Sequence, residues 1–323
     1  MNGPIGRKGL VTIGIPTRNR CELALRCVRS ALAQTYDDIE VVLSDNASTD
    51  GTVRQIDEIG DPRLRILQQH ENVGMTGNFN ACLDNASGEF FLMLSDDDML
   101  ESDAIRQLLE PFQPPSVGLD PGSVGLSWCP CTVVDEKNRT LWHTDGGPAV
   151  EPSLSLVTGL FDGTRGPRFC GILLRTADAR AVGGYQVRHG AICDVGNWTN
   201  VALRYEHVAC ASKPLARYTM HHVSETSRSA VHDWQRAGEN VLADLAEALR
   251  TRGDYAAEKR IDASAKNFIS SLIVTVIMQN VGKSGWTGFA GREALRAARY
   301  LFRPSVAHRL IRNSWKLSRL SRG

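Results

Sequence analysis

The chain has 323 residues, of which 42% are hydrophobic and 23% are charged. This composition is that of an ordinary globular protein and excludes a low-complexity or highly charged disordered chain. The net charge of +1 conceals an asymmetry, because residues 283–323 contain ten Lys or Arg and one acid, whereas the rest of the chain is net acidic. A basic segment of this kind indicates an anionic partner, such as a membrane surface or a nucleic acid.

The first part of the chain alternates short β-branched runs with amphipathic segments. We expect strands at residues 10–15, 39–43, 64–67 and 89–94, and helices at 20–34, 52–59 and 76–85. Pro16 is expected to end the first strand, and Asn19 to cap the first helix. Strands and helices that alternate with short connections predict an α/β domain with a largely parallel sheet. In such sheets, ligands bind at the carboxyl ends of the strands.

A loop rich in proline and glycine, residues 111–125, interrupts this pattern. Beyond it we expect strands at residues 124–134, 140–143 and 169–175, a mobile loop at 146–166, a short helix at 176–182, and helices from 231 onward. The apolar run at 268–281 is shorter than the roughly 20 residues that a bilayer span needs, so we expect a buried or interfacial helix there.

Eight cysteines are scattered along the chain without a CxxC pair. Cys129 and Cys131 have no second ligand pair at zinc spacing, so the cysteines are interpreted as small buried side chains in a reducing compartment. Residues 1–9 contain no apolar signal segment. We therefore expect a cytoplasmic protein, with a peripheral position on the inner face of the cytoplasmic membrane as a further expectation.

The most informative stretch is an apolar run, residues 90–94, that leads through Ser95 into Asp96, Asp97 and Asp98. Three adjacent carboxylates at the end of a buried strand repel one another and need a cation. A hard divalent metal that also carries a phosphate would satisfy them. Polar clusters at 16–20 and 45–52 also follow expected strands. The alternative is a solvated acidic turn before a helix.

Six short motifs, in order, resemble the family 2 glycosyltransferases of the GT-A fold. They are a strand that ends in P-T-x-N-R at 11–20, D-x-x-S-x-D-G-T at 45–52, N-x-G at 72–74, a DxD-type metal motif within 94–98, G-G-Y at 183–185 and an ending similar to Y-R-x-H at 218–221. Each motif alone is weak, whereas six in the family's order are specific. The resemblance covers roughly residues 9–225.

The resemblance implies an α/β fold, a Rossmann-like mixed sheet flanked by helices, with a C-terminal helical extension. We expect a GT-A catalytic domain at residues 1–228, with a nucleotide-sugar half at about 9–110 and an acceptor half at about 124–228, followed by a basic helical region at 229–323. The implied activity is metal-dependent, inverting transfer of a sugar from a nucleotide-sugar to an acceptor hydroxyl in bacterial polysaccharide or glycolipid assembly. The implied cofactor is Mn²⁺ or Mg²⁺, the donor a UDP-, GDP- or dTDP-sugar, and the acceptor a saccharide or a lipid-linked saccharide.

The resemblance also assigns roles to single residues. Asp45 would accept an N–H of the base, although a turn-forming role is the alternative, for which Asp50 is better placed. Asp97 would bind the metal, Asp96 would reach the ribose or a metal-bound water, and Asp98 would orient the loop. His221 would complete the metal shell, with His222 as its rival. The other expected nucleotide-sugar residues are Pro16, Thr17, Arg18, Arg20, Asn46, Asn72, Gly74 and Asn78, and Arg20 would support either the carboxylates or the phosphates.

An inverting transfer needs a general base on the acceptor hydroxyl. The family supplies it from an E-D pair ahead of a helix, and the matching residues here are Cys193 and Asp194. Asp194 is therefore the expected base, and a helix N-cap is the alternative. Cys193 in place of an acid leaves open a second class of protein, a catalytically inactive nucleotide-sugar-binding protein of the same fold. A nucleotidyltransferase is a third possibility, but it would need a glycine-rich phosphate loop, and residues 16–20 contain no glycine.

The basic C-terminal segment carries arginines at helical spacing. Arg292, Arg296, Arg299 and Arg303 would share one face of a helix, with leucine and aromatic residues between them. This pattern suits an anionic membrane surface. A solvated helix face or an oligomer contact is the alternative, and nucleic acid is not expected, because no recognition motif accompanies the charge.

Overall fold

The computed structural model describes residues 6–114, 119–220 and 231–288, with the side chains of all of these except 231 and 274–288. The chain forms two compact units. The first unit comprises Met1–Val157, Arg165–Val187 and Asn197–Met220, and the second comprises Thr158–Thr164, Arg188–Gly196 and His221–Gly323. The division expected at residue 228 assigns 158–164 and 188–196 to the catalytic domain, whereas in the structure both segments belong to the unit of the C-terminal helices.

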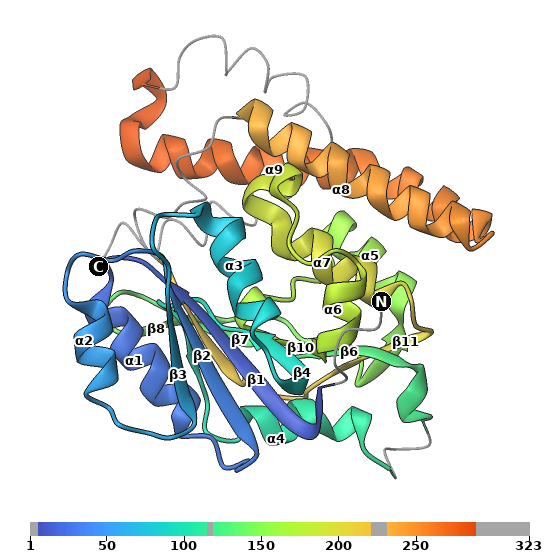
Figure 1. The fold of residues 1–323 in the computed structure, drawn as a ribbon. Helices are drawn as coiled ribbons and strands as arrows, with labels where there is room; N and C mark the ends of the chain where they lie inside the picture. Colours follow the sequence, from blue (N-terminus) through green and yellow to red (C-terminus); the bar gives the residue numbers. More distant parts are fainter. Residues whose placement is uncertain (1–5, 115–118, 221–230, 289–323) are drawn as a thin grey trace. The chain divides into compact units, whose positions relative to one another are not determined.

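The first unit is built on an eight-stranded sheet with the order β3-β2-β1-β4-β10-β6-β11-β9. Four strands form its parallel part: β1 (Arg7–Thr17), β2 (Ile39–Asp45), β3 (Leu64–Gln68) and β4 (Gly88–Met93). The connecting helices are α1 (Cys21–Leu32), α2 (Thr52–Asp57) and α3 (Gly74–Asp84). Figure 1 shows these strands side by side with helices on either face. The expected alternation of strand and helix is confirmed.

Side-chain alternation along β1 determines which helix covers which face of the sheet. Ile13 and Ile15 are fully buried in a cluster that also contains Cys27 of α1. Gly14 faces the other way, where a Cβ atom would lie 2.9 Å from the Cβ of Cys82 in α3. The helices α1 and α3 therefore cover opposite faces, as right-handed crossovers require for this strand order.

The remainder of the large sheet is mixed, as the implied fold class requires. It contains β10 (Ile172–Arg175), β6 (Val124–Trp128), β11 (His207–Cys210) and β9 (Val150–Pro152). β10 is antiparallel to both β4 and β6, β11 is parallel to β6, and β9 is antiparallel to β11. A smaller sheet has the order β5-β12-β7-β8, made of β5 (Met99–Leu100), β12 (Ala216–Thr219), β7 (Cys131–Val134) and β8 (Thr140–His143).

Other short elements complete the first unit or join it to the second. They are α4 (Ala104–Leu109), α5 (Ser153–Asp162), α6 (Thr176–Ala181), α7 (Cys193–Ala202) and the 3-10 helices η1 (Glu110–Phe112), η2 (Pro121–Ser123), η3 (Phe169–Gly171) and η4 (Val187–Ile192). Both α5 and α7 contribute residues to each unit.

Two predictions at the start of the chain were wrong. β1 continues through Pro16 to Thr17, because the nitrogen of Pro16 points toward the β4 side, where pairing ends at the bond from Leu94 N to Gly14 O. Asn19 does not cap α1: the helix begins at Cys21, and the side chain of Asn19 instead accepts a hydrogen bond from Thr49 N.

Two further predictions failed in the second half of the chain. The segment 124–134 is not one strand, because β6 and β7 are separated at residues 129–130 and belong to different sheets. The expected mobile loop 146–166 contains β9 and α5. The apolar residues Leu156, Val157 and Phe161 of α5 are fully buried, so this helix is defined by burial rather than by its short sequence pattern.

The described part of the second unit contains α8 (Val231–Thr251) and α9 (Tyr255–Gly288), which pack against each other. Trp234, Val241 and Leu245 are buried along one stripe of α8, as their spacing predicts. The rings of Phe161 and Phe268 lie 4.3 Å apart between centroids. None of the described helices is long and apolar enough to cross a bilayer.

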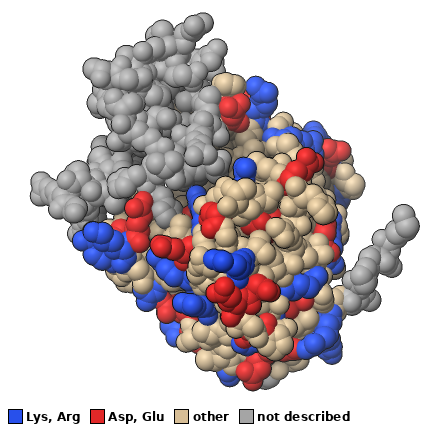
Figure 2. Space-filling view, turned by 60° about the vertical axis from the view of Figure 1, so that its left-hand side comes forward, with Lys and Arg blue, Asp and Glu red and all other residues tan. Residues whose placement is uncertain are grey.

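Charged side chains of both signs are interspersed over the described residues on the face shown in Figure 2. By sequence, the excess of basic residues lies in segment 283–323, most of which is outside the described residues. All eight cysteines are free thiols, and seven of them are buried, as expected for small core residues.

The close packing at Gly14 leads to a stability prediction. Gly14→Ala should lower the free energy of unfolding by about 1–3 kcal/mol, because the new methyl group would press on Cys82 and on the ring of Phe91. Gly166→Ala is the matched control, since a Cβ there meets nothing within 4 Å. Urea denaturation of both variants tests this. Equal midpoints for the two variants would contradict the packing described here.

Candidate functional site

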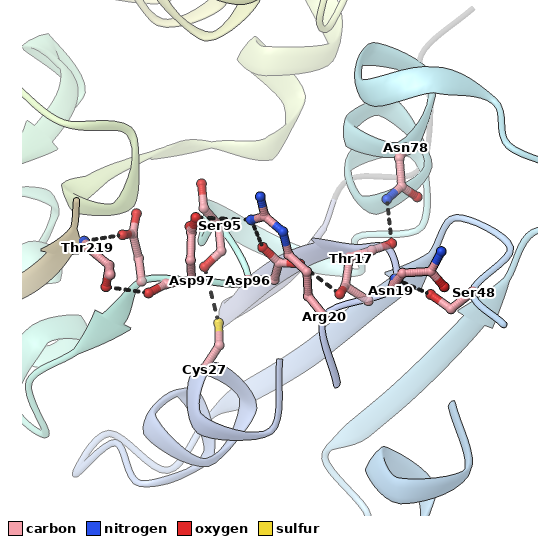
Figure 3. Close-up of polar contacts among 11 residues, drawn as sticks. Thr17, Asn19, Arg20, Cys27, Ser48, Asn78, Ser95, Asp96, Asp97 and Thr219 are labelled. Atoms are coloured by element: carbon pink, nitrogen blue, oxygen red, sulfur yellow. Dashed lines mark hydrogen bonds and ion pairs between the residues drawn. The ribbon is translucent and has the colours of Figure 1, made fainter. Parts of the chain in front are cut away.

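The carboxyl ends of β1, β2 and β4 meet at one edge of the large sheet. Thr17 pairs with Asp45 in the register of β1 and β2, and Asn46 N donates to Thr17 O at 2.9 Å. On the other side, Leu94 N donates to Gly14 O at 2.8 Å. The three polar clusters expected at strand ends are therefore adjacent in space (Figure 3).

Arg20 ties the acid triplet to the end of β1. Its Nη1 atom lies 3.0 Å from Asp96 Oδ1 and 3.0 Å from Asp97 Oδ2. Thr17 Oγ1 donates to the other oxygen of Asp96 at 2.8 Å. In Figure 3 the guanidinium group points toward both carboxylates. Such charge-assisted bonds hold the loop after β4 against the loop after β1.

The electrostatics of the triplet follow from burial and from repulsion between its members. Burial, together with the nearby charge of Asp97, raises the pKa of Asp96 to about 6, although Arg20 and Thr17 act in the opposite direction. Burial and Asp97 likewise raise the pKa of Asp98 well above its ordinary value. Both shifts disfavour the ionised carboxylates, so burial of the triplet beside Arg20 costs free energy at this edge of the sheet.

Asp98 and the backbone of Asp97 are fixed by β12, which comes from far along the chain. Thr219 N donates to Asp98 Oδ1 at 2.8 Å, and Thr219 Oγ1 donates to Asp97 O at 2.5 Å. Asp98 is 2% exposed. The loop that carries the triplet is therefore held at one end by Arg20 and at the other by Thr219.

The loops after β1 and β2 brace each other. Asn19 N donates to Ser48 Oγ at 2.8 Å, and Thr49 N donates to Asn19 Oδ1 at the same distance. Asp50 Oδ1 accepts from Thr52 N, where α2 begins, and Asp50 Oδ2 accepts from Cys21 N. Asp50 thus forms the turn that leads into α2.

Asp45 lies at the end of β2, and only one of its two carboxylate oxygens has a hydrogen-bond partner among the described residues. Its Oδ2 atom accepts from Ser48 N at 3.0 Å. Its Oδ1 atom is buried and has no hydrogen-bond partner among the described residues. A buried acceptor without a partner is costly, so this atom suits an N–H group supplied by a ligand.

Asn46 holds the N-x-G turn at the start of α3. Asn46 Nδ2 donates to Asn72 Oδ1 at 2.9 Å and to Gly74 O at 3.3 Å, and Asn46 Oδ1 accepts from Val73 N at 2.8 Å. Gly74 has a φ of 77°, a conformation that glycine adopts without strain. The structure therefore brings three of the expected nucleotide-sugar residues together in one turn.

Asn78 is buried, and its amide is used within the fold. It donates to Ser44 O at 3.0 Å and to Thr17 O at 3.4 Å, and it accepts from Ser44 Oγ at 2.7 Å. Asn80, two residues farther along α3, exchanges two hydrogen bonds with the backbone of Tyr185. Both amides connect α3 to other segments, so the geometry gives Asn78 a positioning role behind the strand ends.

The remaining expected residues lie in different places. Pro16 is buried in β1, and Arg18 is exposed in the loop that follows. His221 and His222 lie outside the described residues. Asp194 lies in the first turn of α7, within the second compact unit, and is half-buried. Because α7 begins at Cys193, Asp194 is inside the helix and is not its N-cap.

Comparison with known protein families identifies the region that carries these strand ends. Residues 12–125 match the sequence model of the family described as glycosyl transferase family 2. This region has the sequence of a glycosyl transferase family 2 domain. The match includes β1 to β4, the loops at their carboxyl ends and the acid triplet.

Several curated proteins share this family 2 region. The chain is 39% identical over 110 residues to the hyaluronan synthase of Pasteurella multocida and 38% identical over 109 residues to the chondroitin synthase of Escherichia coli. These matches span a third of this chain but only 11% and 16% of the two synthases. The succinoglycan biosynthesis protein ExoO of Rhizobium meliloti is 27% identical over 97% of this chain and 89% of its own length.

A solved structure supports the fold over most of the chain. The crystal structure of S. aureus TarS 1–349 in complex with UDP-GlcNAc superposes with a TM-score of 0.62, covering 90% of this chain and 79% of the TarS 1–349 chain at 16% sequence identity. The likeness concerns the fold alone, which is the GT-A fold expected from the motifs.

The donor set of the triplet fits a hard divalent cation. Carboxylate oxygens are the ligands that Mn²⁺ and Mg²⁺ prefer. The charge of a bound cation would lower the raised pKa of Asp96 and favour its ionised form. In the described part of the chain, no three His, Cys, Asp or Glu side chains converge closely enough to form a metal site by themselves.

Two further residues shape this site. Thr219, within the motif at 218–221, holds Asp98 and Asp97 through its N–H and hydroxyl. Ser44, at the end of β2, donates to Asn78. Neither contact has a local sequence signal, because each joins segments that only the fold brings together.

The bond between Thr17 and Asp96 leads to a prediction for the metal-free protein. Thr17→Val keeps the side-chain shape but removes a donor to a buried carboxylate, so it should lower the free energy of unfolding by about 1–3 kcal/mol. Thr49→Val, at an exposed position of the neighbouring loop, is the control. Denaturation in the presence of EDTA measures both. A Thr17→Val protein as stable as the wild type would contradict a supporting role for this hydroxyl.

Proposed function

We propose that this chain is a metal-dependent, inverting glycosyltransferase that moves a sugar from a nucleotide-sugar to an acceptor hydroxyl in polysaccharide or glycolipid assembly. The observation that carries the proposal is the cluster of Asp96, Asp97 and Asp98 at the end of β4, beside the open oxygen of Asp45 at the end of β2. The names of the relatives, which include polysaccharide synthases and a succinoglycan biosynthesis protein, support the direction of the proposal.

For the donor, Asp45 Oδ1 would accept an N–H of the nucleotide base. Pro16, Thr17 and Arg18 would line the nucleotide from the end of β1. Asn46, Asn72 and Gly74 would line it from the N-x-G turn, which they shape. The base of the donor is left open among uracil, guanine and thymine, and a thermal-shift screen with UDP, GDP and dTDP plus Mn²⁺ would distinguish them. TarS binds UDP-GlcNAc, which makes UDP the first nucleotide to try.

For the cation, Asp97 would be the principal ligand, with His221 as a further one and Asp96 within reach of the ribose or of a metal-bound water. Bound Mn²⁺ or Mg²⁺ supplies charge that stabilises the leaving diphosphate. Arg20 holds Asp96 and Asp97 in place, and Thr219 holds the backbone of the loop. These contacts keep the carboxylates oriented before the donor arrives.

For the transfer, Asp194 would take the proton of the acceptor hydroxyl. The acceptor oxygen forms a bond to the anomeric carbon as the bond from that carbon to the diphosphate oxygen breaks, and the nucleoside diphosphate leaves with the electron pair. Attack opposite the leaving group inverts the configuration. Proton transfer by a positioned carboxylate of this kind contributes about 10²- to 10⁴-fold in rate.

The main alternative is a nucleotide-sugar-binding protein of the same fold without catalytic activity, since Cys193 stands where relatives carry an acid. Turnover of a donor that disappears with EDTA excludes it. A nucleotidyltransferase is disfavoured because the loop at 16–20 has no glycine. For the basic segment 283–323, an anionic membrane surface is the proposed partner, on its charge alone.

The metal assignment is tested by Asp97→Asn. The amide loses the charge that binds a hard cation, so the variant should lose both transfer and Mn²⁺-dependent nucleotide binding while its far-UV circular dichroism stays unchanged. Asp57→Asn, an exposed acid in α2, is the matched control. Isothermal titration with UDP, GDP and dTDP, with and without Mn²⁺, gives the answer. If Asp97→Asn binds nucleotide with the metal-dependent affinity of the wild type, Asp97 is not a metal ligand.

The base assignment is tested by Asp194→Asn. This variant should bind nucleotide as the wild type does, because the expected nucleotide residues lie elsewhere in the chain, but turnover should fall by about 10²- to 10⁴-fold. Steady-state assays of transfer or donor hydrolysis measure the loss. Near-normal turnover would leave Asp194 as a residue that stabilises the start of α7 and would move the base to another group.

A further inference from the structure

Two polar side chains of α8 bind the segment that leads into α7. Arg188 Nη2 and His189 Nε2 each lie 2.8 Å from the same oxygen, Asp244 Oδ2. Asn240 Nδ2 donates to Arg188 O at 2.7 Å. Asn240 and Asp244 are four residues apart, so they lie on one face of α8. All of these residues belong to the same compact unit.

The chain has a kink at Gly190, between the residues bound by α8 and the start of α7. Gly190 has a φ of 50° and a ψ of −134°, a conformation open essentially to glycine alone. A Cβ at Gly190 would lie 3.5 Å from the Cβ of Ala237, which precedes Asn240 by one turn on the same face of α8. The segment 188–192 is therefore bent against α8 and leads directly into Cys193, the first residue of α7.

The imidazole of His189 packs against α7. His189 is 2% exposed, and a Cβ built on Gly196 would lie 2.2 Å from its Nδ1 atom. Gly196 is thus required for the ring to lie flush against the first turn of α7. The Nδ1 atom is buried without a hydrogen-bond partner among the described residues, and burial lowers the pKa of His189. A neutral ring whose Nε2–H donates to Asp244 fits both observations.

We propose that Asp244 and His189 are positioning residues that fix the first turn of α7, and with it the carboxylate of Asp194. The contacts run from Asp244 to the ring of His189, and from that ring to Gly196, two residues beyond Asp194. This inference rests on the proposed function of Asp194 as the general base. Its consequence is that α8 acts in catalysis by holding the base, independently of any role for the basic segment that follows.

The test combines a kinetic comparison with a double-mutant cycle. Asp244→Asn keeps the shape but removes the charge that two partners share. Turnover of the probes UDP-N-acetylglucosamine, GDP-mannose and dTDP-glucose is followed with Mn²⁺. We expect kcat to fall by about 10- to 100-fold, as for a misplaced catalytic group, while KM for the donor and Mn²⁺-dependent nucleotide binding stay unchanged. Glu247→Gln, an exposed acid one turn farther along α8, should behave as wild type.

The cycle distinguishes positioning from general destabilisation. In the Asp194→Asn background, Asp244→Asn should cause no further loss of kcat, because the group that it positions is already absent. Gly196→Ala is a second route, since it displaces the His189 ring but leaves both carboxylates in place, and it should also lower kcat selectively. Gly196→Ala replaces Asp244→Asn in this test if Asp244→Asn fails to fold.

Each outcome bears on a different claim. An active wild type whose kcat is unchanged by both Asp244→Asn and Gly196→Ala overturns the positioning role alone. The same holds if Asp244→Asn and Asp194→Asn lower kcat additively. A wild type that binds nucleotide with Mn²⁺ but turns over none of the donors overturns the proposed transfer activity, and the positioning role falls with it.

Discussion

The site described here depends on one electrostatic constraint: three carboxyl groups lie together at the end of a buried strand. Asp96 and Asp98 are almost inaccessible to solvent, so their charges cannot be screened by water. Arg20 offsets part of the cost through its bonds to Asp96 and Asp97. The remaining cost appears as the raised pKa values of Asp96 and Asp98, and the divalent cation that we propose here would lower that cost.

Hydrogen bonds of the surrounding residues hold the neighbouring strand ends together. Asn46 and Asn78 use their amides to join the end of β2 to the start of α3 and to the end of β1. Buried polar networks of this kind are stable only when nearly every donor and acceptor is satisfied. Asp45 Oδ1 is the exception in this network, and it is the atom at which we propose that an N–H of the nucleotide base binds.

The C-terminal helix α8 contacts the segment that precedes α7, a contact that the charge distribution of the sequence does not predict. The sequence drew attention to the basic segment that follows them, whereas the structure draws attention to Asn240 and Asp244 of α8, which hold the segment before α7. Residues 12–125 match the family 2 model and include the strand ends to which we assign the nucleotide-sugar. The proposed base lies outside that region, and its support comes from residues that the family motifs do not include.

Sequence patterns alone determined the fold class, the strands β1 to β4 and the acids at their ends, because each rests on local signals: an apolar run, a turn cluster and a repeated order of motifs. Patterns failed where burial overrode them, as in α5, and where one apolar stretch served two sheets, as in β6 and β7. The tertiary structure alone decided that Arg20 meets Asp96 and Asp97 and that Thr219 holds the loop beyond them. These contacts span 76, 77 and more than 120 residues, and they depend on the register of β1 against β4 and of β12 against β5, which no local pattern encodes.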